Sequence, residues 1–176
     1  MIYTIGHSTK PQQELIDLLQ LYKVRLLVDV RTIPRSRHNP QFNREELERA
    51  IPAARIEYLH YPQLGGLRRP VKDSPNQGWK HSGFRGFADY MMTGEFERAL
   101  QTLIDRSREK QLAVMCAEAV YWRCHRMLIS DALLVREIEV RHILNARRDE
   151  IHKLTKFAKV DGVNLTYPPE QSSLDF

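Results

Sequence analysis

Cysteine is scarce in this chain of 176 residues, and long apolar runs and repeated or low-complexity segments are missing. Two cysteines cannot build the disulfide framework of a small secreted protein, so we expect the protein to work reduced in the cytoplasm. No apolar run approaches the roughly 18 residues that span a bilayer, so no membrane role is expected. The strand-like start, Met1 to Ile5, has no basic region before it, so we expect no signal peptide.

The sequence has an ordinary globular composition with a basic balance. It is 42% hydrophobic and 28% charged, which fits one domain large enough to bury a core without disulfides. The net charge of +5 points to an anionic partner, and the candidates are DNA, RNA or a nucleotide. No helix-turn-helix, zinc-finger or RNA-recognition motif is visible in the sequence. Nothing in it indicates the oligomeric state.

Five apolar segments are typical of strands, and they are expected at residues 2–5, 24–30, 55–60, 112–116 and 139–144. The helices between them carry apolar residues at helical spacing, as Leu15, Leu18, Leu19 and Tyr22 do. Such alternation predicts an α/β, three-layer, single-domain fold with a mostly parallel five-stranded sheet and helices on both faces. We expect an α/β domain at 1–144, followed at 145–176 by a helix around 150–158 and an extended tail.

The segment LAVMCAEAVYWRCHR, at 112–126, is the expected functional centre. Its first five residues predict a buried strand that ends on Cys116, and MLISDALL after it continues at helical spacing. The polar residues in between therefore lie at a strand-to-helix turn. At such a turn, free N–H groups and the helix dipole favour anions and thiolates.

Basic side chains follow the ends of the predicted strands. Ligands of open α/β sheets bind outside the carboxyl ends of the strands, so the basic charge should gather on one rim. The arginines concerned are Arg31, Arg35, Arg37, Arg68, Arg69, Arg123 and Arg126. Arginine is suited to bidentate contacts with phosphate or carboxylate. The segment 61–81 has no clear periodicity, and ordered loops of this length are often lids or binding loops.

Several separated motifs resemble one family. The segments TIGHS, LLVDVRTIPRSR, QFN, YLHYPQLGG and MCAEAVYWRCHR, in this order, resemble the domain of unknown function 488 family over about residues 2–144. The resemblance implies a small bacterial or archaeal type of α/β protein without an assigned activity, so it gives a location for the site and no reaction. The family's marked positions fall here on His7, Asp29, Arg31, Arg37, Asn43, Gly65, Gly66, Cys116, Glu118, Cys124, His125 and Arg126.

Two chemistries stay open at the turn after the fourth strand. Cys116 is either a small buried residue or a reactive thiolate. The order strand, cysteine, loop, arginine, helix is also that of phosphatase and rhodanese anion cradles, but Arg123 lies seven residues beyond Cys116, which is not the phosphatase spacing. Cys116, Cys124 and His125 offer soft metal ligands, although structural zinc sites generally place their cysteines closer in sequence.

Our hypothesis from the sequence is an enzyme that acts on a phosphate-bearing substrate, a nucleotide or nucleic acid, in a cleft at the strand ends. Catalytic roles are assigned to Cys116, Glu118, His7 and His125, and structural or orienting roles to Asp29 and Cys124. Anion binding is assigned to Arg31, Arg35, Arg37, Asn43, Gly65, Gly66, Arg68, Arg123 and Arg126. The cofactor is unknown, and no metal is assigned.

Two alternatives remain beside this hypothesis. The first is a non-catalytic nucleic-acid or nucleotide binding module that uses the same basic rim. The second is a metal-binding protein with Cys116, Cys124 and His125 as ligands.

Overall fold

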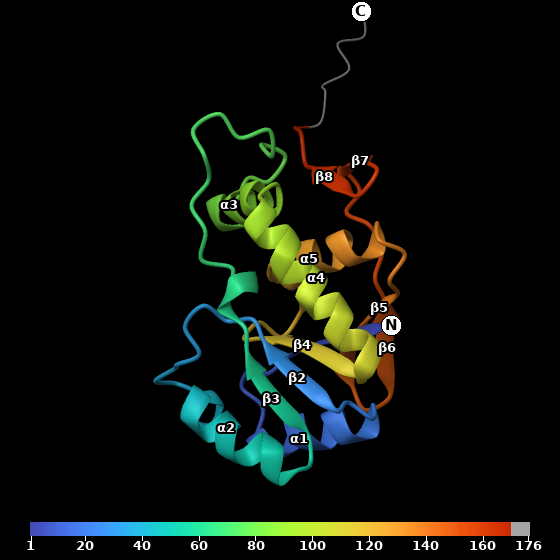
Figure 1. The fold of residues 1–176 in the computed structure, drawn as a ribbon. Helices are drawn as coiled ribbons and strands as arrows, with labels where there is room; N and C mark the ends of the chain where they lie inside the picture. The colour runs from blue at the N-terminus through green and yellow to red at the C-terminus, as the bar shows by residue number, and fades with distance from the viewer. Residues whose placement is uncertain (170–176) are drawn as a thin grey trace, which may run out of the picture.

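The computed structural model describes residues 1–169, and Figure 1 shows a sheet between two layers of helices. Its six strands lie in the order β3-β2-β4-β1-β5-β6. They are β1 (Ile2–Gly6), β2 (Leu26–Asp29), β3 (Glu57–His60), β4 (Leu112–Cys116), β5 (Val140–Asn145) and β6 (Arg148–Ile151). The first five pair in parallel, so the predicted α/β class with a mostly parallel sheet is confirmed, and the antiparallel β6 extends it.

Helices cover both faces of this sheet. They are α1 (Gln12–Leu21), α2 (Arg44–Ala53), α3 (Ser82–Met91), α4 (Gly94–Glu109) and α5 (Arg126–Leu134). On one face, Leu19 of α1 and Leu47 of α2 share a core with Leu27 of β2. On the other, Leu100 of α4 packs in a core with Val28, the next residue of β2. Successive strand residues point to opposite faces, so β2 must be apolar throughout. None of the described helices has the length and apolar character needed to cross a membrane.

The end of the chain differs from the sequence-based expectation. The prediction of a helix around 150–158 is wrong. The first residues of this stretch belong to strand β6, which pairs with the edge of β5. The chain after β6 is then held by Asp131 of α5, which accepts hydrogen bonds from the backbone and the hydroxyl of Thr155. These tertiary contacts outweigh local helix propensity. A short hairpin follows, with β7 (Lys159–Asp161) and β8 (Asn164–Thr166). The rest of the predicted tail, from 170, lies outside the described residues.

The strand order reverses direction between β1 and β4. These two strands are neighbours, yet the helix that follows β1 packs on one face of the sheet and the helix that follows β4 packs on the other. Chains that leave adjacent strands toward opposite faces open a crevice at the carboxyl ends. In this protein the backbone N–H of His7, which follows β1, donates to the oxygen of Cys116, the last residue of β4, so the crevice opens beyond these two residues.

Candidate active site at the ends of β1 and β4

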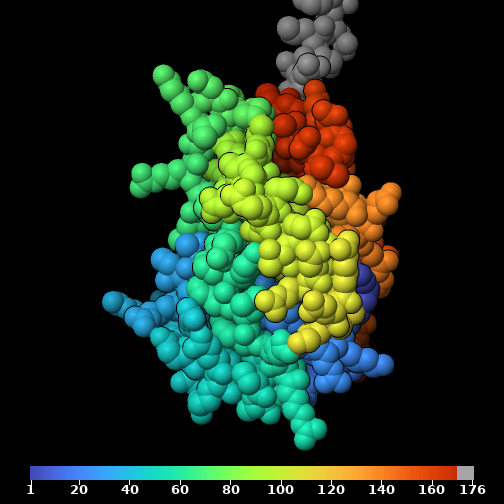
Figure 2. Space-filling view, viewed as in Figure 1, coloured from blue at the N-terminus to red at the C-terminus, as the bar shows by residue number. Residues whose placement is uncertain are grey.

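A cavity of about 360 Å³ opens at the carboxyl ends of the parallel strands. The predicted site residues that line it are Arg31, Gly66, Cys116, Glu118, Arg123, Cys124 and His125. A second hollow shares Arg31 and Glu118 with this cavity and also contains His7 and Arg35. Figure 2 shows the loops after β2 (blue) and β3 (green) projecting on the same side of the molecule. The strand ends thus bring distant segments to one place.

The two cysteines and His125 form a cluster in this cavity. Cys116 ends β4, and the chain then runs through a 3₁₀ turn, η3 (Tyr121–Arg123), which returns Cys124 to the end of the same strand. Nδ1 of His125 lies 3.7 Å from Sγ of Cys124 and 4.0 Å from Sγ of Cys116. The two sulfurs and the ring nitrogen lie within 4.8 Å of one another. Cysteines that are far apart in sequence are therefore neighbours in space.

Arg126 supplies a buried positive charge beside this cluster. It is the first residue of α5 and is 1% exposed. Its Nε donates to Sγ of Cys124 at 3.5 Å, and its Nη2 donates to the backbone oxygen of Glu118. No carboxylate among residues 1–169 forms an ion pair with it. A buried guanidinium needs a compensating negative charge, and a thiolate at Cys124 is the group in contact that can supply it.

The surroundings shift the pKa values of the two thiols in opposite directions. Hydrogen bonding to Cys124 and burial raise the pKa of Cys116 well above its usual value. Burial alone would raise the pKa of Cys124 as well, but hydrogen bonds from Cys116 and His125 and the charge of Arg126 hold that pKa well below its usual value. These contacts favour the anionic form at Cys124 and the protonated form at Cys116. These electrostatics favour Cys124 over Cys116 as the reactive sulfur.

Two glycines allow the backbone to close around this cluster. A Cβ atom on Gly6 would lie 1.9 Å from the backbone oxygen of Glu118, so the turn after β4 rests directly on the end of β1. A Cβ atom on Gly66 would lie 2.5 Å from Nδ1 of His125, so the loop after β3 packs on the imidazole ring. Neither position has room for a side chain.

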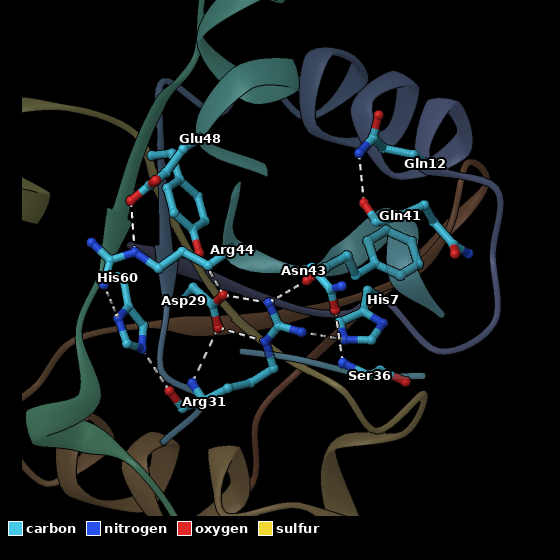
Figure 3. A network of polar contacts seen from close by, with 12 residues as sticks. His7, Gln12, Asp29, Arg31, Ser36, Gln41, Asn43, Arg44, Glu48 and His60 are labelled. Atoms are coloured by element: carbon cyan, nitrogen blue, oxygen red, sulfur yellow. Dashed lines mark hydrogen bonds and ion pairs between the residues drawn. The ribbon is translucent and has the colours of Figure 1, made fainter. Parts of the chain in front are cut away.

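A second polar network fixes the ends of β1 and β2 (Figure 3). Asp29 is fully buried and accepts from Nε and Nη2 of Arg31 at 2.8 and 2.6 Å. The hydroxyl of Tyr58 donates to the same carboxylate at 2.7 Å. Arg31 also donates to the backbone oxygen of Phe42, at 2.8 Å. Hydrogen bonds to acceptors within the protein therefore occupy most of the donor groups of this guanidinium.

His7 is held at the centre of this network. Nη1 of Arg31 lies 3.1 Å from Nε2 of His7, and Nδ1 of His7 lies 2.8 Å from the backbone oxygen of Ser8. Since Arg31 can only donate, Nε2 accepts and Nδ1 carries the proton. The ring stacks on Phe42, and burial lowers the pKa of His7 to about 4. His7 is thus a neutral imidazole with both ring nitrogens occupied, and its position suits orientation of Arg31.

A family model described as "Domain of unknown function DUF488" matches residues 11–133, well over half of the chain. The protein belongs to this family. No protein with a curated description and no solved structure gives a significant match. The matched range of the DUF488 protein contains the Cys116, Cys124 and His125 cluster but not His7 or β5.

The remaining predicted anion-binding residues of the DUF488 protein lie in different surroundings. Arg68 donates to the backbone oxygens of Gly65 and Gln63, and its guanidinium lies over the ring of Tyr90. Arg35 pairs with Glu45 on the surface. Arg37 and Arg123 are exposed, and neither guanidinium group donates to another of the described residues.

Two further predicted residues of this set have a structural role. Asn43 stands at the start of α2, but its side chain accepts from the backbone N–H of Ser36. A Cβ atom on Gly65 would lie 2.3 Å from Oγ1 of Thr32, so Gly65 lets the loops after β2 and β3 touch. Arg123 is consequently the predicted arginine that both lines the main cavity and is free to meet a ligand.

One wall of the cavity escaped the sequence reasoning. Leu67, His81 and Gly83 line it, and they come from the long loop after β3 and the start of α3. This loop is anchored by Asp89 of α3, which accepts from the backbone N–H of Val71 and from the side chains of Ser74 and Asn76. The length of the loop was a signal for a binding role, but no periodicity indicated which of its residues face inward.

The cluster of Cys116, Cys124 and His125 is also the one group of three such ligands that the described part of the DUF488 protein offers to a metal ion. A zinc ion would need tetrahedral ligands at roughly 2.0–2.3 Å. The buried guanidinium of Arg126, 3.5 Å from one of the sulfurs, repels a cation at this position. Its charge favours an anionic sulfur instead.

Proposed function

We propose that this DUF488 protein is an enzyme that acts on a phosphate-bearing substrate, a nucleotide or nucleic acid, with the sulfur of Cys124 as nucleophile. The observation that carries the proposal is the surroundings of that sulfur, which contacts Nε of Arg126 and Nδ1 of His125 beside an open cavity. A thiolate with a fixed cation next to it and access to solvent is the arrangement of a catalytic cysteine.

Arg123 is the group proposed to bind the phosphate. It lines the cavity, it is exposed, and its guanidinium donates to no other described residue. Guanidinium groups bind phosphate oxygens in pairs. The amino end of α5 begins at Arg126, next to the thiolate, and its dipole adds positive potential there. Arg31 and Arg68 are less suited, since contacts within the protein occupy their guanidinium groups.

The chemistry proposed for this geometry has two steps. In the first, the thiolate of Cys124 attacks phosphorus, an S–P bond forms, the ester P–O bond breaks, and the leaving oxygen takes a proton from water. In the second, water attacks phosphorus, a P–O bond forms, the S–P bond breaks to release the thiolate of Cys124, and Glu118, which lines the same cavity, accepts the proton of that water. Glu118 then returns that proton to the hydroxide left by the first step. The enzyme is restored, and the net reaction is hydrolysis.

The test is turnover of a panel of nucleoside mono-, di- and triphosphates and short single-stranded oligonucleotides, followed by phosphorus NMR. Cys124→Ser is expected to abolish turnover and to keep binding, measured by titration calorimetry. Arg123→Gln is expected to weaken binding of the substrate about tenfold, because one charge-assisted contact is lost. The matched control is Arg25→Gln, which removes an exposed arginine at the amino end of β2, far along the strand from the cavity.

Three results would contradict the proposal. They are the absence of turnover across the panel, turnover that survives Cys124→Ser, and stoichiometric zinc in the purified protein.

The alternative of a non-catalytic binder is favoured by exposed cations such as Arg37, Arg69 and Lys72, which form no ion pairs within the described part of the chain. Such a binder would lose affinity with each cation removed and would show a steep dependence on salt.

A further inference from the structure

The sequence contains two cysteines, and the fold places both sulfurs together in one cavity. Sγ of Cys116 and Sγ of Cys124 lie within 4.8 Å of each other, with Nδ1 of His125 beside them. A disulfide requires about 2.05 Å between sulfurs, so a small movement of one side chain would bring the pair into bonding range. The segment between them, Ala117 to Arg123, begins with three exposed residues and is not part of the sheet.

Access to this pair is restricted by size. Cys116 is 8% exposed and Cys124 is 4% exposed, and what they do expose faces the cavity. A peroxide can enter a space of this volume, whereas a protein thiol cannot reach sulfurs that are buried to this extent. A second protein therefore cannot supply the partner for a disulfide, and the neighbouring sulfur is that of the one other cysteine in the sequence.

The two sulfurs have different surroundings, which sets the order of events. Cys124 is the one that contacts Nε of Arg126, and it lies closer to His125 than Cys116 does. Oxidation begins at the sulfur with thiolate character. The neighbouring thiol then meets the sulfenic acid, in the arrangement of a resolving cysteine next to a peroxide-reactive one.

We infer that Cys124 and Cys116 form an oxidative modification site, at which a peroxide closes a reversible intrachain disulfide and so switches off the reactive sulfur. In the first step the thiolate of Cys124 attacks hydrogen peroxide, the O–O bond breaks, and Cys124 sulfenic acid and hydroxide form. In the second, the sulfur of Cys116 attacks the sulfenic sulfur, the S–S bond forms, and water leaves with the proton of Cys116. Two electrons pass from the two sulfurs to the peroxide.

The same contacts make this disulfide easy to reduce. Closing it removes the negative charge beside Arg126 and leaves the guanidinium with the backbone oxygen of Glu118 as its remaining hydrogen-bond partner within residues 1–169. A reduced form that is stabilised by such a contact makes the disulfide more oxidising. The oxidised state should therefore return to the dithiol with mild reductants such as glutathione. The effect of oxidation on turnover depends on the proposed function, but formation of the disulfide does not.

The test is treatment of the reduced, full-length protein with stoichiometric hydrogen peroxide, followed by intact mass and peptide mapping. Loss of two hydrogen atoms and a cross-linked peptide with Cys116 and Cys124 are expected, both reversed by glutathione. In Cys116→Ser, Cys124 should remain as a sulfenic acid that dimedone labels. Cys116→Ala serves the same purpose if a hydroxyl at this position disturbs the fold. In Cys124→Ser, Cys116 should stay unoxidised at the same peroxide concentration.

The outcomes separate this inference from the proposed function. If reduced Cys124 reacts rapidly with iodoacetamide at neutral pH but peroxide yields only sulfinic acid or disulfide-linked dimers, the inference is wrong and the catalytic proposal is untouched. If the intrachain disulfide forms and no phosphate compound is turned over, the inference is supported and the proposed function fails. Equal peroxide reactivity of Cys116 in Cys124→Ser would also overturn the inference.

Discussion

Nε of Arg126 lies 3.5 Å from the sulfur of Cys124, and this contact joins the first residue of α5 to the cysteine that η3 returns to the end of β4. The arginine is one of the largest fully buried side chains of the protein. Arg126 favours the anionic form of that sulfur, and an anionic sulfur would compensate a charge that is otherwise costly to bury. Stability and reactivity of the site are therefore linked through one pair of residues.

Arg126→Gln should change both properties. We expect the free energy of unfolding to fall by about 3 kcal/mol, because one partner of a buried charged pair is removed. Alkylation of Cys124 by iodoacetamide at pH 7 should become slower, since less of the sulfur is ionised. Urea unfolding and mass-resolved alkylation measure the two effects. Arg126→Lys, which keeps a positive charge, should restore part of the alkylation rate, and an unchanged rate in Arg126→Gln would contradict the proposed contact.

Gly66→Ala tests the packing of the β3 loop on His125. The added Cβ atom would start 2.5 Å from Nδ1 of the imidazole, so the ring or the loop must move. Overpacking of this kind typically costs about 1–3 kcal/mol, measurable by urea unfolding. Gly94→Ala is the matched control, because its Cβ atom meets only the flexible end of Arg98 at 3.3 Å. Equal stability of the two variants would show that the loop does not rest on the ring.

Asp29→Asn should be among the most destabilising single changes outside the apolar core. It removes the charge that pairs with buried Arg31 and one acceptor of Tyr58, and we expect a loss of about 3–5 kcal/mol. Tyr58→Phe removes a single hydrogen bond to the same carboxylate and should cost about 1 kcal/mol. Chemical denaturation measures the loss of unfolding free energy in each variant. Equal losses in the two variants would mean that Arg31 finds another partner in Asp29→Asn.

Acid should destabilise the protein as the pH falls below about 6.5, the ordinary histidine pKa. Burial, followed by the charges of His152 and Arg126, lowers the pKa of His142 to about 2. The unfolded chain binds a proton near pH 6.5 and the folded chain does not, so each unit of pH below this costs up to about 1.4 kcal/mol. His7, with a pKa of about 4, acts in the same direction.

Unfolding free energies at pH 7 and pH 5 test this prediction. Within the fold, His142 faces the hydroxyl of Thr4, the stacked ring of Tyr121 and Nδ1 of His152, with Arg126 close enough to contribute charge. None of these groups offers a negative charge to an imidazolium. His142→Asn should reduce the difference between the two pH values, and equal stability of the natural protein at pH 7 and pH 5 would contradict the assignment.

Much of the fold was predictable from the sequence because its strands are short, apolar and separated by amphipathic helices. The helix α4 carries Phe96, Leu100 and Leu103 on one face, and these residues are buried as their spacing predicts. The prediction of a helix around 150–158 was wrong because the conformation of this segment is decided by partners distant in sequence. These partners are the edge of β5 and Asp131. No local pattern records such contacts.

The site was predictable in place but less so in detail. The strand-end rule brings Cys116, Arg31 and Gly66 to one cavity. The spacing of residues in the sequence could not predict the path of the chain after Cys116. The chain folds back there, which makes Cys124 a neighbour of Cys116 in space. Nor could charge counting distinguish an arginine that faces a ligand from one that an internal acceptor occupies. Arg31 and Arg123 look alike in the sequence, and only their contacts separate them.

The anchoring of the β3 loop by Asp89 means that the wall of the cavity and its sulfurs belong to separately supported parts of the chain. Changes in the length or composition of this loop beyond Gly66 can reshape the space above Cys124 while β4 and α5 keep its sulfur in place. Under the proposed function, proteins of this architecture can differ in the substrate that they bind while they keep the same arrangement around the sulfur. Exchanging such loops between related chains would be a direct way to redirect selectivity.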